Sequence, residues 1–267
     1  MIQRLLMYFM PIVVLCSFTM QTPADTFCGI RNTAFKPGEV VTMKVFYSTL
    51  GMYVGAGEAT FTTTLERFNG KTTYHCVGEG KSYSFFDNFF KVRDRYESYI
   101  DTATMQPLKF MRNTDEGGYK IYNNVTFNHE AGTAVSTNGL FKTPNCIQDV
   151  MSAVYYARNI NFDKYKPGDK IPFDMFLDDE VYHLYIRYLG KEKVKTQYGK
   201  FNAIKFKPLL IKGTIFEGGE KMNAWVSDDP NHLLLRVESP ISVGSIKVDM
   251  YGYRNLRYPL TSLISVR

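Results

Sequence analysis

Four acidic residues lie in segments of the first half of the chain that alternate like β-strands: Glu58, Glu79, Asp94 and Glu97. Glycoside hydrolysis needs only two carboxyl groups that face each other across a cleft, so these residues could supply a catalytic pair. Acidic side chains on antiparallel strands more commonly face solvent on the polar side of the sheet. A polysaccharide-acting hydrolase with paired strand carboxylates is therefore kept as an alternative, and no residue is assigned as catalytic.

The segment from residue 83 to residue 90, with the sequence YSFFDNFF, places five aromatic side chains within eight residues between two predicted strands. It could form a short helix or loop that plugs one end of a barrel, or it could form the lip of an apolar ligand site. The plug is the favoured interpretation, because the uncovered end of a sheet needs apolar cover.

Three arginines follow this aromatic segment in the sequence. Residues 93 and 95 share one face of a strand because side chains alternate along it. If that face points inward beside the aromatic residues, the site suits an amphiphile with an anionic head, such as a lipid or an acylated glycan. If it points outward, it is a solvated face balanced by Asp94 and Glu97. The candidate ligand-binding residues are Phe85, Phe86, Phe89, Phe90, Arg93, Arg95, Arg112 and the single tryptophan, Trp225.

The sequence shows no pattern for metal, cofactor or nucleotide chemistry. The four histidines, His75, His129, His183 and His232, do not pair at metal-ligand spacing, so we expect no metal site. Neither a Walker A loop nor a GxSxG nucleophile is present, and we expect no cofactor. The net charge of +6 is spread among acidic residues without a basic block, which argues against a nucleic-acid partner.

The first 24 residues have the pattern of a secretory signal peptide, with cleavage expected after Ala24. The apolar run from Leu5 to Met20 is shorter than the ~20 residues that a spanning helix needs, so a retained anchor is a weaker alternative. Cys16 leaves a lipoprotein as another alternative, and we expect membrane contact only if this residue is lipidated. The mature chain is therefore predicted to be exported to the periplasm or cell envelope.

Cleavage would leave three cysteines in the mature chain. Cys76 lies within a strand pattern and is predicted to be packed, whereas Cys28 and Cys146 lie in irregular segments. An oxidising compartment allows one disulfide. The spacing does not fix the pairing, and we favour a bond between Cys28 and Cys146.

The composition favours a β-rich scaffold, because aromatic residues make up 15% of the chain and suit the pleated surface of a sheet. Asn69-Gly70 predicts a two-residue hairpin turn. Apolar residues at helical spacing predict one helix from Ile147 to Asn159, with Asn145 as its N-cap. The predicted strands are 41–50, 54–65, 71–77, 92–100, 108–113, 119–127 and 133–137 in the first half, and 171–176, 181–189, 201–210, 222–226, 233–238 and 243–253 in the second.

Two short phrases suggest that the halves are related. FKPGE at residues 35–39 and YKPGD at residues 165–169 each precede a strand pattern, and Asp101 and Asp228 recur at nearly the same offset. Coincidence is the alternative, since proline, glycine and aspartate are common in turns. We predict one mainly β domain over residues 25–267: an antiparallel curved sheet or open β-barrel, with half-repeats at about 34–140 and 164–257 and a linking helix at about 147–159. The sequence does not decide between one continuous sheet and two lobes.

Eight phrases occur in a fixed order along the chain and together resemble one protein family. They are AFKPGE (34–39), VGAGEA (54–59), FKVRDRYESYID (90–101), DVMSAVYYAR (149–158), YLGKEKV (188–194), GKFNAIKFKP (199–208), AWVSDD (224–229) and ESPISVGSIKVDM (238–250). The set resembles the exported bacterial family called domain of unknown function 3108 over nearly the whole mature chain. The resemblance implies a β-rich envelope protein without an assigned reaction, and it supplies no catalytic residues.

Export, high aromatic content and the lack of a catalytic motif lead to one expectation about function. We expect a non-catalytic cell-envelope protein that binds an amphiphilic lipid or a carbohydrate component. The alternatives are the hydrolase described above and an assembly factor that binds other envelope proteins.

Overall fold

The computed structural model describes residues 28–49, 52–212, 218–241 and 244–267. The predicted signal peptide, with Cys16, lies outside these residues. The first series of strands is β1 (Val40–Thr49), β2 (Met52–Phe68), β3 (Lys71–Ser82), β4 (Val92–Asp101), β5 (Pro107–Glu116), β6 (Tyr119–Asn128), β7 (Thr133–Ser136) and β8 (Gly139–Lys142). The second series is β9 (Lys170–Leu177), β10 (Glu180–Lys195), β11 (Gly199–Pro208), β12 (Asn223–Ser227), β13 (Leu234–Pro240), β14 (Ser245–Arg254) and β15 (Leu263–Val266). The helices are α1 (Ser84–Asp87), α2 (Val150–Ala157) and the short 3₁₀ helix η1 (Phe162–Lys164).

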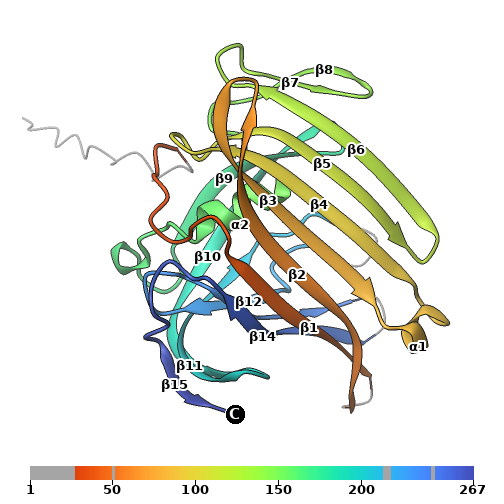
Figure 1. Ribbon diagram of the computed structural model, residues 1–267, viewed down its shortest axis with the longest axis vertical. Coiled ribbons are helices and arrows are strands. Elements are labelled where there is room, and N and C mark those ends of the chain that lie inside the picture. Colours follow the sequence, from red (N-terminus) through yellow and green to blue (C-terminus); the bar gives the residue numbers. More distant parts are fainter. Residues whose placement is uncertain (1–27, 50–51, 213–217, 242–243) are drawn as a thin grey trace, which may run out of the picture.

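All fifteen strands of the described chain belong to one antiparallel sheet, which curves strongly without closing into a barrel (Figure 1). Its order is β8-β7-β6-β5-β4-β3-β2-β1-β14-β13-β12-β11-β10-β9, and β15 pairs with β11. The two halves meet where β1 pairs with β14. The predicted antiparallel open sheet is therefore confirmed, and its halves form one continuous surface.

Local sequence explains most of the strand boundaries. Asn69 and Gly70 have φ angles of +49° and +79°, as a two-residue hairpin turn of this kind requires, and they join β2 to β3. The predicted end of β10 at residue 189 was wrong. Gly190, with φ at +106°, forms a bulge against β11 that bends the strand, and pairing continues to Lys195. The predictions also missed β8 and β15, which have only four residues each.

The two repeated phrases adopt the same structure. Gly38 and Gly168 have φ angles of +84° and +103°, a conformation that favours glycine, immediately before β1 and β9. The Gly38 amide donates to the Thr63 carbonyl of β2 at 2.7 Å, and the Gly168 amide donates to the Tyr188 carbonyl of β10 at 2.8 Å. Each phrase thus fixes the first hairpin of its half. The origin of the halves from a repeat stays a prediction.

Helix α2 lies inside the curve of the sheet and begins with a capping box. The Asp149 side chain accepts from the Ser152 amide at 2.7 Å, and the Asp149 amide donates to the Ser152 hydroxyl at 2.8 Å. Two buried hydrogen bonds tie the helix to the sheet: the Ser98 hydroxyl donates to Asp149 at 2.6 Å, and the Thr63 hydroxyl donates to Tyr155 at 3.0 Å. The helix is therefore fixed to β2 and β4 by polar contacts as well as by packing.

The predicted start of this helix was too early. Asn145 is not its N-cap, and Ile147 precedes the first turn. The reason is the neighbouring Gln148, which pairs with β9 through its backbone. Its backbone N–H donates to the Asp174 backbone carbonyl at 2.9 Å, and its backbone carbonyl accepts from the Phe176 backbone N–H at 2.8 Å. These bonds to the free edge of β9 keep this part of the chain extended.

Side chains bring the two free edges of the sheet together. The Phe176 ring of β9 lies 6.1 Å from the Phe127 ring of β6 and 5.7 Å from the Phe141 ring of β8, between ring centroids. Arg112 of β5 donates to Asp178 in the turn between β9 and β10. The sheet is thus open in its backbone hydrogen bonds, and side-chain packing joins its edges.

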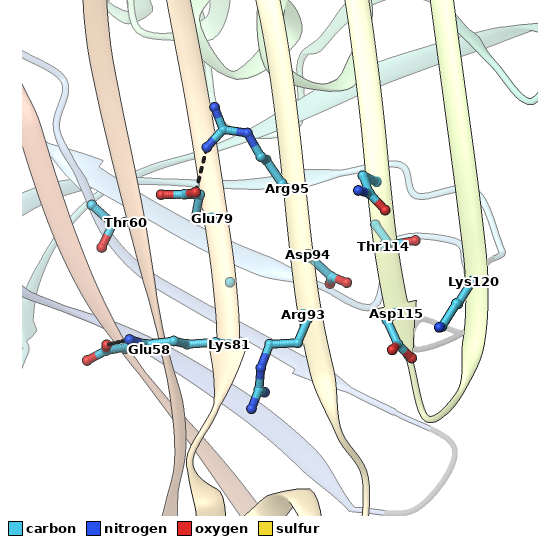
Figure 2. A pocket seen from close by; sticks show the side chains of 12 residues that line it. Glu58, Thr60, Glu79, Lys81, Arg93, Asp94, Arg95, Thr114, Asp115 and Lys120 are labelled. Atoms are coloured by element: carbon cyan, nitrogen blue, oxygen red, sulfur yellow. Dashed lines mark hydrogen bonds and ion pairs between the residues drawn. The ribbon is translucent and has the colours of Figure 1, made fainter.

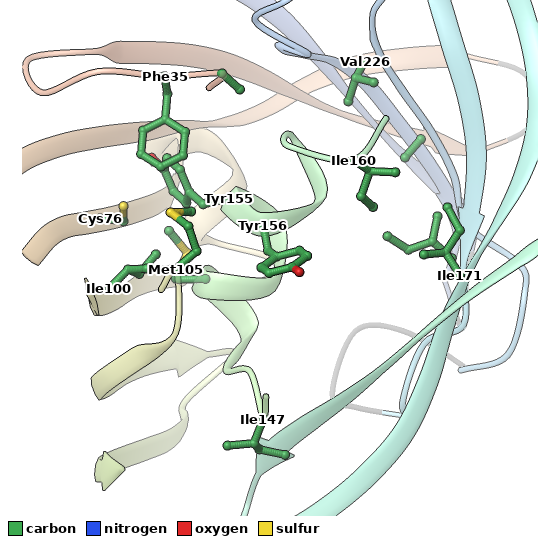
Figure 3. Packing of buried hydrophobic residues seen from close by; sticks show 14 of the residues in the cluster. Phe35, Cys76, Ile100, Met105, Ile147, Tyr155, Tyr156, Ile160, Ile171 and Val226 are labelled. Carbon is green, nitrogen blue, oxygen red and sulfur yellow. The ribbon is translucent and has the colours of Figure 1, made fainter. Parts of the chain in front are cut away.

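The main hydrophobic core fills the space between the two arms of the sheet around α2 (Figure 3). Ile100 of β4 and Phe35 ahead of β1 approach it from the first arm, and Ile171 of β9 and Val226 of β12 from the second. Tyr156 of α2 lies between the arms and is almost completely buried. The helix therefore supplies the apolar surface that both arms need.

A disulfide joins Cys28 to Cys146, the pair favoured from the sequence, with 5.3 Å between their Cα atoms. It links the segment ahead of β1 to the segment ahead of α2. Cys76 of β3 is a buried free thiol. Among the described residues, no helix has the length and apolar character needed to cross a membrane.

Candidate functional site

Side-chain alternation decides which candidate residues share a face. A Cβ atom built on Gly78 of β3 would lie 3.2 Å from the sulfur of Met151 in α2, so this position faces the interior. Tyr96 of β4 pairs with Gly78 and faces the same way. Arg93 and Arg95 are offset by an odd number of positions from Tyr96, so both point outward.

The predicted arginine cluster is therefore split between two faces. Arg112 of β5 pairs with Tyr96 and is directed inward, where it is buried and bonded to Asp178. It cannot act with Arg93 and Arg95, which are on the opposite face. The side chains of Arg93 and Arg95 therefore point outward, which was the second of the two orientations considered from the sequence.

Trp225 of β12 also lies apart from the other candidates. Its side chain is buried in a second hydrophobic cluster, which contains Phe201 and Leu235. Its indole nitrogen donates to Glu192 at 2.6 Å, and the Lys205 ammonium lies 5.0 Å from the ring centroid. These contacts give Trp225 a packing role in the second half of the sheet.

A groove of about 580 Å³ runs across β2 to β6 on the outer face of the first arm (Figure 2). We call it the outer groove. Its lining contains Glu58, Thr60, Glu79, Gly80, Lys81, Arg93, Asp94, Arg95, Asn113, Thr114, Asp115 and Lys120. Four of these residues are cationic, and three acids, Glu58, Glu79 and Asp115, share their outward register. The fourth acid, Asp94, is on the inward register.

Several side chains of the outer groove form ion pairs, either across neighbouring strands or along β4. The Lys81 ammonium lies 2.9 Å from Glu58, and the Arg95 guanidinium lies 2.5 Å from Glu79 and 2.7 Å from Glu97. These pairs are partly exposed, so each adds only about 0–1 kcal/mol to stability. Their main effect is to hold donors and acceptors side by side at the surface.

The ion pairs continue along β4 in the direction away from the aromatic segment. His75 bridges two acids, with its Nδ1 atom 2.8 Å from Glu66 and its Nε2 atom 2.8 Å from Glu97. Partial burial alone would raise the pKa of Glu97, but hydrogen bonds from Arg95 and His75 lower it below its ordinary value. Glu97 is therefore held as a carboxylate and is poorly suited to act as a general acid.

The aromatic segment does not plug the sheet. It forms the single turn of α1 beyond the ends of β3 and β4, where Phe85 and Phe89 are 67% and 73% exposed and Phe90 is also exposed. Phe86 is half-buried, and its ring centroid lies 5.9 Å from that of Tyr47. A one-turn helix is too short to turn all four rings inward. We call these four phenylalanines the aromatic tip.

The aromatic tip is fixed to the end of the outer groove that Arg93 forms. The Arg93 guanidinium lies 2.6 Å from Asp87 of α1, and Asp87 also accepts a hydrogen bond from the Ser82 hydroxyl. Hydrogen bonds from Arg93, followed by the one from Ser82, lower the pKa of Asp87. Six of the eight sequence candidates, namely the four phenylalanines, Arg93 and Arg95, thus belong to one continuous surface.

Sequence reasoning missed Lys81, Asp115 and Lys120 as parts of this surface. The predicted hairpin could have indicated one of them. Glu58 and Lys81 are equally distant from the Asn69-Gly70 turn, so a two-residue turn places them opposite each other, as observed. The positions of Asp115 and Lys120 follow in the same way from the turn between β5 and β6.

Comparison with known families gives one match. A family model described as "Protein of unknown function (DUF3108)" matches residues 41–251, as the ordered phrases predicted. No curated protein matches the chain significantly.

Three solved structures match the chain at low sequence identity. A β-barrel-like protein of the domain of unknown function DUF1849 from Brucella abortus is 7% identical, with a TM-score of 0.56, and the match covers 86% of this chain and 100% of that one. A "putative exported protein with YmcC-like fold" from Bacteroides fragilis is 13% identical, with a TM-score of 0.31 and coverage of 85% and 100%. A "putative lipoprotein" from Parabacteroides distasonis is 11% identical, with a TM-score of 0.36 and coverage of 84% and 100%. The first of these supports the fold alone.

Proposed function

The chain belongs to the DUF3108 family of proteins of unknown function, and we propose that it is an exported, non-catalytic protein that binds a carbohydrate component of the cell envelope in its outer groove. The ligand's hydroxyl groups would lie along the paired charges of β2 to β6. An apolar portion of the ligand, or an apolar face of a sugar ring, would contact the aromatic tip.

The pairing of charges in the outer groove carries this proposal. An anionic lipid head would need free cations, but Lys81, Arg93 and Arg95 are already paired with acids. A sugar hydroxyl both donates and accepts hydrogen bonds, so it can bridge a guanidinium and a neighbouring carboxylate. A neutral glycan therefore fits this surface better than an anionic lipid does.

Two observations support export. The disulfide between Cys28 and Cys146 is of a kind that persists in oxidising compartments and is rare in the cytosol. The first 24 residues have the signal-peptide pattern described above. The periplasm or cell envelope is the compartment that combines both features with a glycan ligand.

The geometry gives less support to the hydrolase alternative. A general acid for glycoside cleavage needs a raised pKa, usually from an apolar pocket. The outward carboxylates Glu58, Glu79 and Glu97 are each within 3 Å of a cation instead. Asp94 has a raised pKa, but its side chain belongs to the inner face of the sheet.

The test is a binding panel with the mature protein against immobilised neutral oligosaccharides and against vesicles of anionic phosphatidylglycerol. We expect binding to one neutral glycan class, and a loss of at least tenfold in affinity for Arg95→Gln, which removes donors to two acids. Arg187→Gln is the matched control, because Arg187 pairs with Glu220 on the second half of the sheet. Binding to phosphatidylglycerol alone, or equal losses in both variants, would contradict the proposal.

A further inference from the structure

Exposed apolar side chains gather at one end of the sheet, where the first residues of β2 pair with β1 and where α1 follows β3 (Figure 1). They are Met52, Tyr53, Val54, Phe85, Phe89 and Phe90, and each is at least 40% exposed. The three residues of β2 are consecutive, so apolar side chains point to both faces of this strand. A contiguous apolar patch of this kind marks an interaction surface.

The start of β2 and the aromatic tip are neighbours in space. The Tyr83 backbone N–H, at the N-cap of α1, donates to the Ala56 carbonyl of β2 at 2.9 Å. The Phe86 ring of the aromatic tip lies 5.9 Å from the Tyr47 ring of β1, between ring centroids. The two exposed groups therefore form one surface. We call residues 52–54 together with the aromatic tip the apolar end.

Two lysines lie next to the apolar end and differ from the paired cations of the outer groove. The Lys247 ammonium of β14 lies 3.9 Å from the Tyr53 ring centroid and 5.4 Å from the Phe46 ring centroid. The Lys44 ammonium of β1 lies 3.9 Å from the ring centroid of Tyr251, which is exposed. Among the residues that the structure describes, neither lysine forms an ion pair, so both cations are free to meet an anion.

Strand register places these lysines on the outer face, in a fixed order behind the apolar end. Lys44 pairs with the outward-facing Glu58, and Phe46 is on the same face, two residues closer to the apolar end. Lys247 pairs with Phe46, and the β1 partner of Tyr53 is two residues farther still. A strand rises about 3.3 Å per residue, so Lys247 lies about 7 Å and Lys44 about 13 Å behind the level of Tyr53.

We propose that the apolar end docks onto a bilayer surface that carries anionic lipids. The side chains of residues 52–54, Phe85 and Phe89 would enter the boundary between headgroups and acyl chains, to a depth of about 5–10 Å. Lys247 would then lie at the level of the lipid phosphates, with Lys44 behind it. Aromatic side chains followed by lysines are typical of protein segments at a membrane interface.

The charge pattern favours a bilayer over a protein partner. The cores of protein–protein interfaces are depleted of lysine, whereas Lys247 lies directly against Tyr53 of the apolar end. A second copy of the chain, docked through the same surface about a two-fold axis, would bring unpaired lysines of both copies together. A layer of lipid phosphates supplies the negative charge that the apolar end and its two lysines lack.

This inference does not depend on glycan binding. The apolar end and the proposed glycan site share only the aromatic tip, so substitutions in residues 52–54 and in the two lysines test docking alone. Docking would hold the outer groove beside the lipid headgroups, because Arg93 at one end of the groove is bonded to Asp87 of α1.

The experiment is co-sedimentation of the mature, disulfide-bonded protein with vesicles made of equal parts phosphatidylglycerol and phosphatidylcholine, and with vesicles of phosphatidylcholine alone. We expect saturable binding to the mixed vesicles. The double variant Met52→Ser with Tyr53→Ser should bind them at least tenfold more weakly, because it removes two apolar side chains from the boundary. Lys44→Gln with Lys247→Gln should weaken binding to the mixed vesicles about tenfold and leave binding to phosphatidylcholine unchanged.

Matched controls lie away from the apolar end. Leu140→Ser removes a side chain of β8 that is 69% exposed, and Lys109→Gln removes an ammonium that lies 5.8 Å from the Phe68 ring centroid. Both variants should bind the mixed vesicles as the native protein does. Arg95→Gln should also bind them normally while it loses glycan binding, so failure of docking and failure of the proposed function are separate results.

Four results would overturn the proposal. They are no saturable binding of the native protein to the mixed vesicles, native-like binding by the Met52→Ser, Tyr53→Ser variant, an equal loss in Leu140→Ser, and a dimer in solution that this double variant dissociates while the native protein binds no vesicles. The last result would identify the apolar end as an interface between copies of the chain. If the double variant does not fold, the lysine variant decides, and its native-like binding to the mixed vesicles would contradict the proposal.

Discussion

A buried ion pair fixes the first strand to the central helix, and its removal gives a sharp test of the fold. Glu39, immediately before β1, and Arg158, the C-cap of α2, are 1% and 7% exposed. Arg158 donates to both carboxylate oxygens of Glu39. Its Nε and Nη2 atoms also donate to the backbone carbonyl of Asn231, at 3.1 and 3.0 Å. The guanidinium lies 5.3 Å from the Phe35 ring centroid. One side chain thus joins β1, α2 and the turn before β13.

Glu39→Gln leaves the guanidinium buried without its counter-charge. Breaking a buried pair costs about 3–5 kcal/mol. The two bonds to Asn231 remain, so we expect the lower end, about 3 kcal/mol, which for a chain of this size corresponds to a fall of roughly 6–12 °C in melting temperature. The double variant Glu39→Leu with Arg158→Met should recover most of this loss, because an apolar replacement of both partners is often neutral.

The assay is thermal and urea unfolding followed by circular dichroism. Lys81→Gln serves as the control, since its partner Glu58 lies at the surface and the exposed pair adds less than about 1 kcal/mol. A loss below about 1 kcal/mol for Glu39→Gln would refute the reasoning. A double variant less stable than the single one would show that packing around Phe35, and not charge, dominates this junction.

Three further predictions use the same unfolding assay. Reduction of the bond between Cys28 and Cys146 should lower stability by at most about 4–5 kcal/mol, since it closes a loop of more than 100 residues, and no effect of reductant on the melting temperature would contradict this. Phe89→Ser should change stability by less than about 0.5 kcal/mol, because the ring is largely exposed, and should weaken glycan binding; a large loss of stability would show that the ring belongs to the core. Burial raises the pKa of Asp149 to about 7, so the folded state binds more protons than the unfolded state between about pH 4 and 7, and stability should fall as pH rises through that range. Asp149→Asn should flatten this dependence, and an unchanged pH profile would count against it.

The fold was largely predictable from local sequence, because short-range physics dominates an antiparallel meander. The Asn69-Gly70 turn set the register between β2 and β3, and the glycines of the two repeated phrases set the start of each half. The start of α2 was not predictable, because Gln148 pairs with a strand that lies far along the chain. Whether the halves form one sheet depended on the pairing of β1 with β14, which no local pattern specifies.

The candidate site was predictable in part for the same reason. Alternation showed that Arg93 and Arg95 share a face, but it could not show which face is inward until α2 was placed against Gly78. The pairing of Arg112 with Asp178 joins opposite edges of the sheet, so sequence proximity to Arg93 was misleading. The exposure of Phe89 depended on how far α1 extends beyond β3, which composition does not determine.

The most direct test of the proposed function is to map where a neutral oligosaccharide binds. We would record the backbone amide shifts of the mature protein during titration with the oligosaccharide that binds most tightly in the panel. The account predicts that the largest shifts fall on outward positions of β2 to β6, around Arg95 and Glu79, and on the aromatic tip. Shifts confined to the second half of the sheet, or no saturable shift with any neutral oligosaccharide, would contradict it.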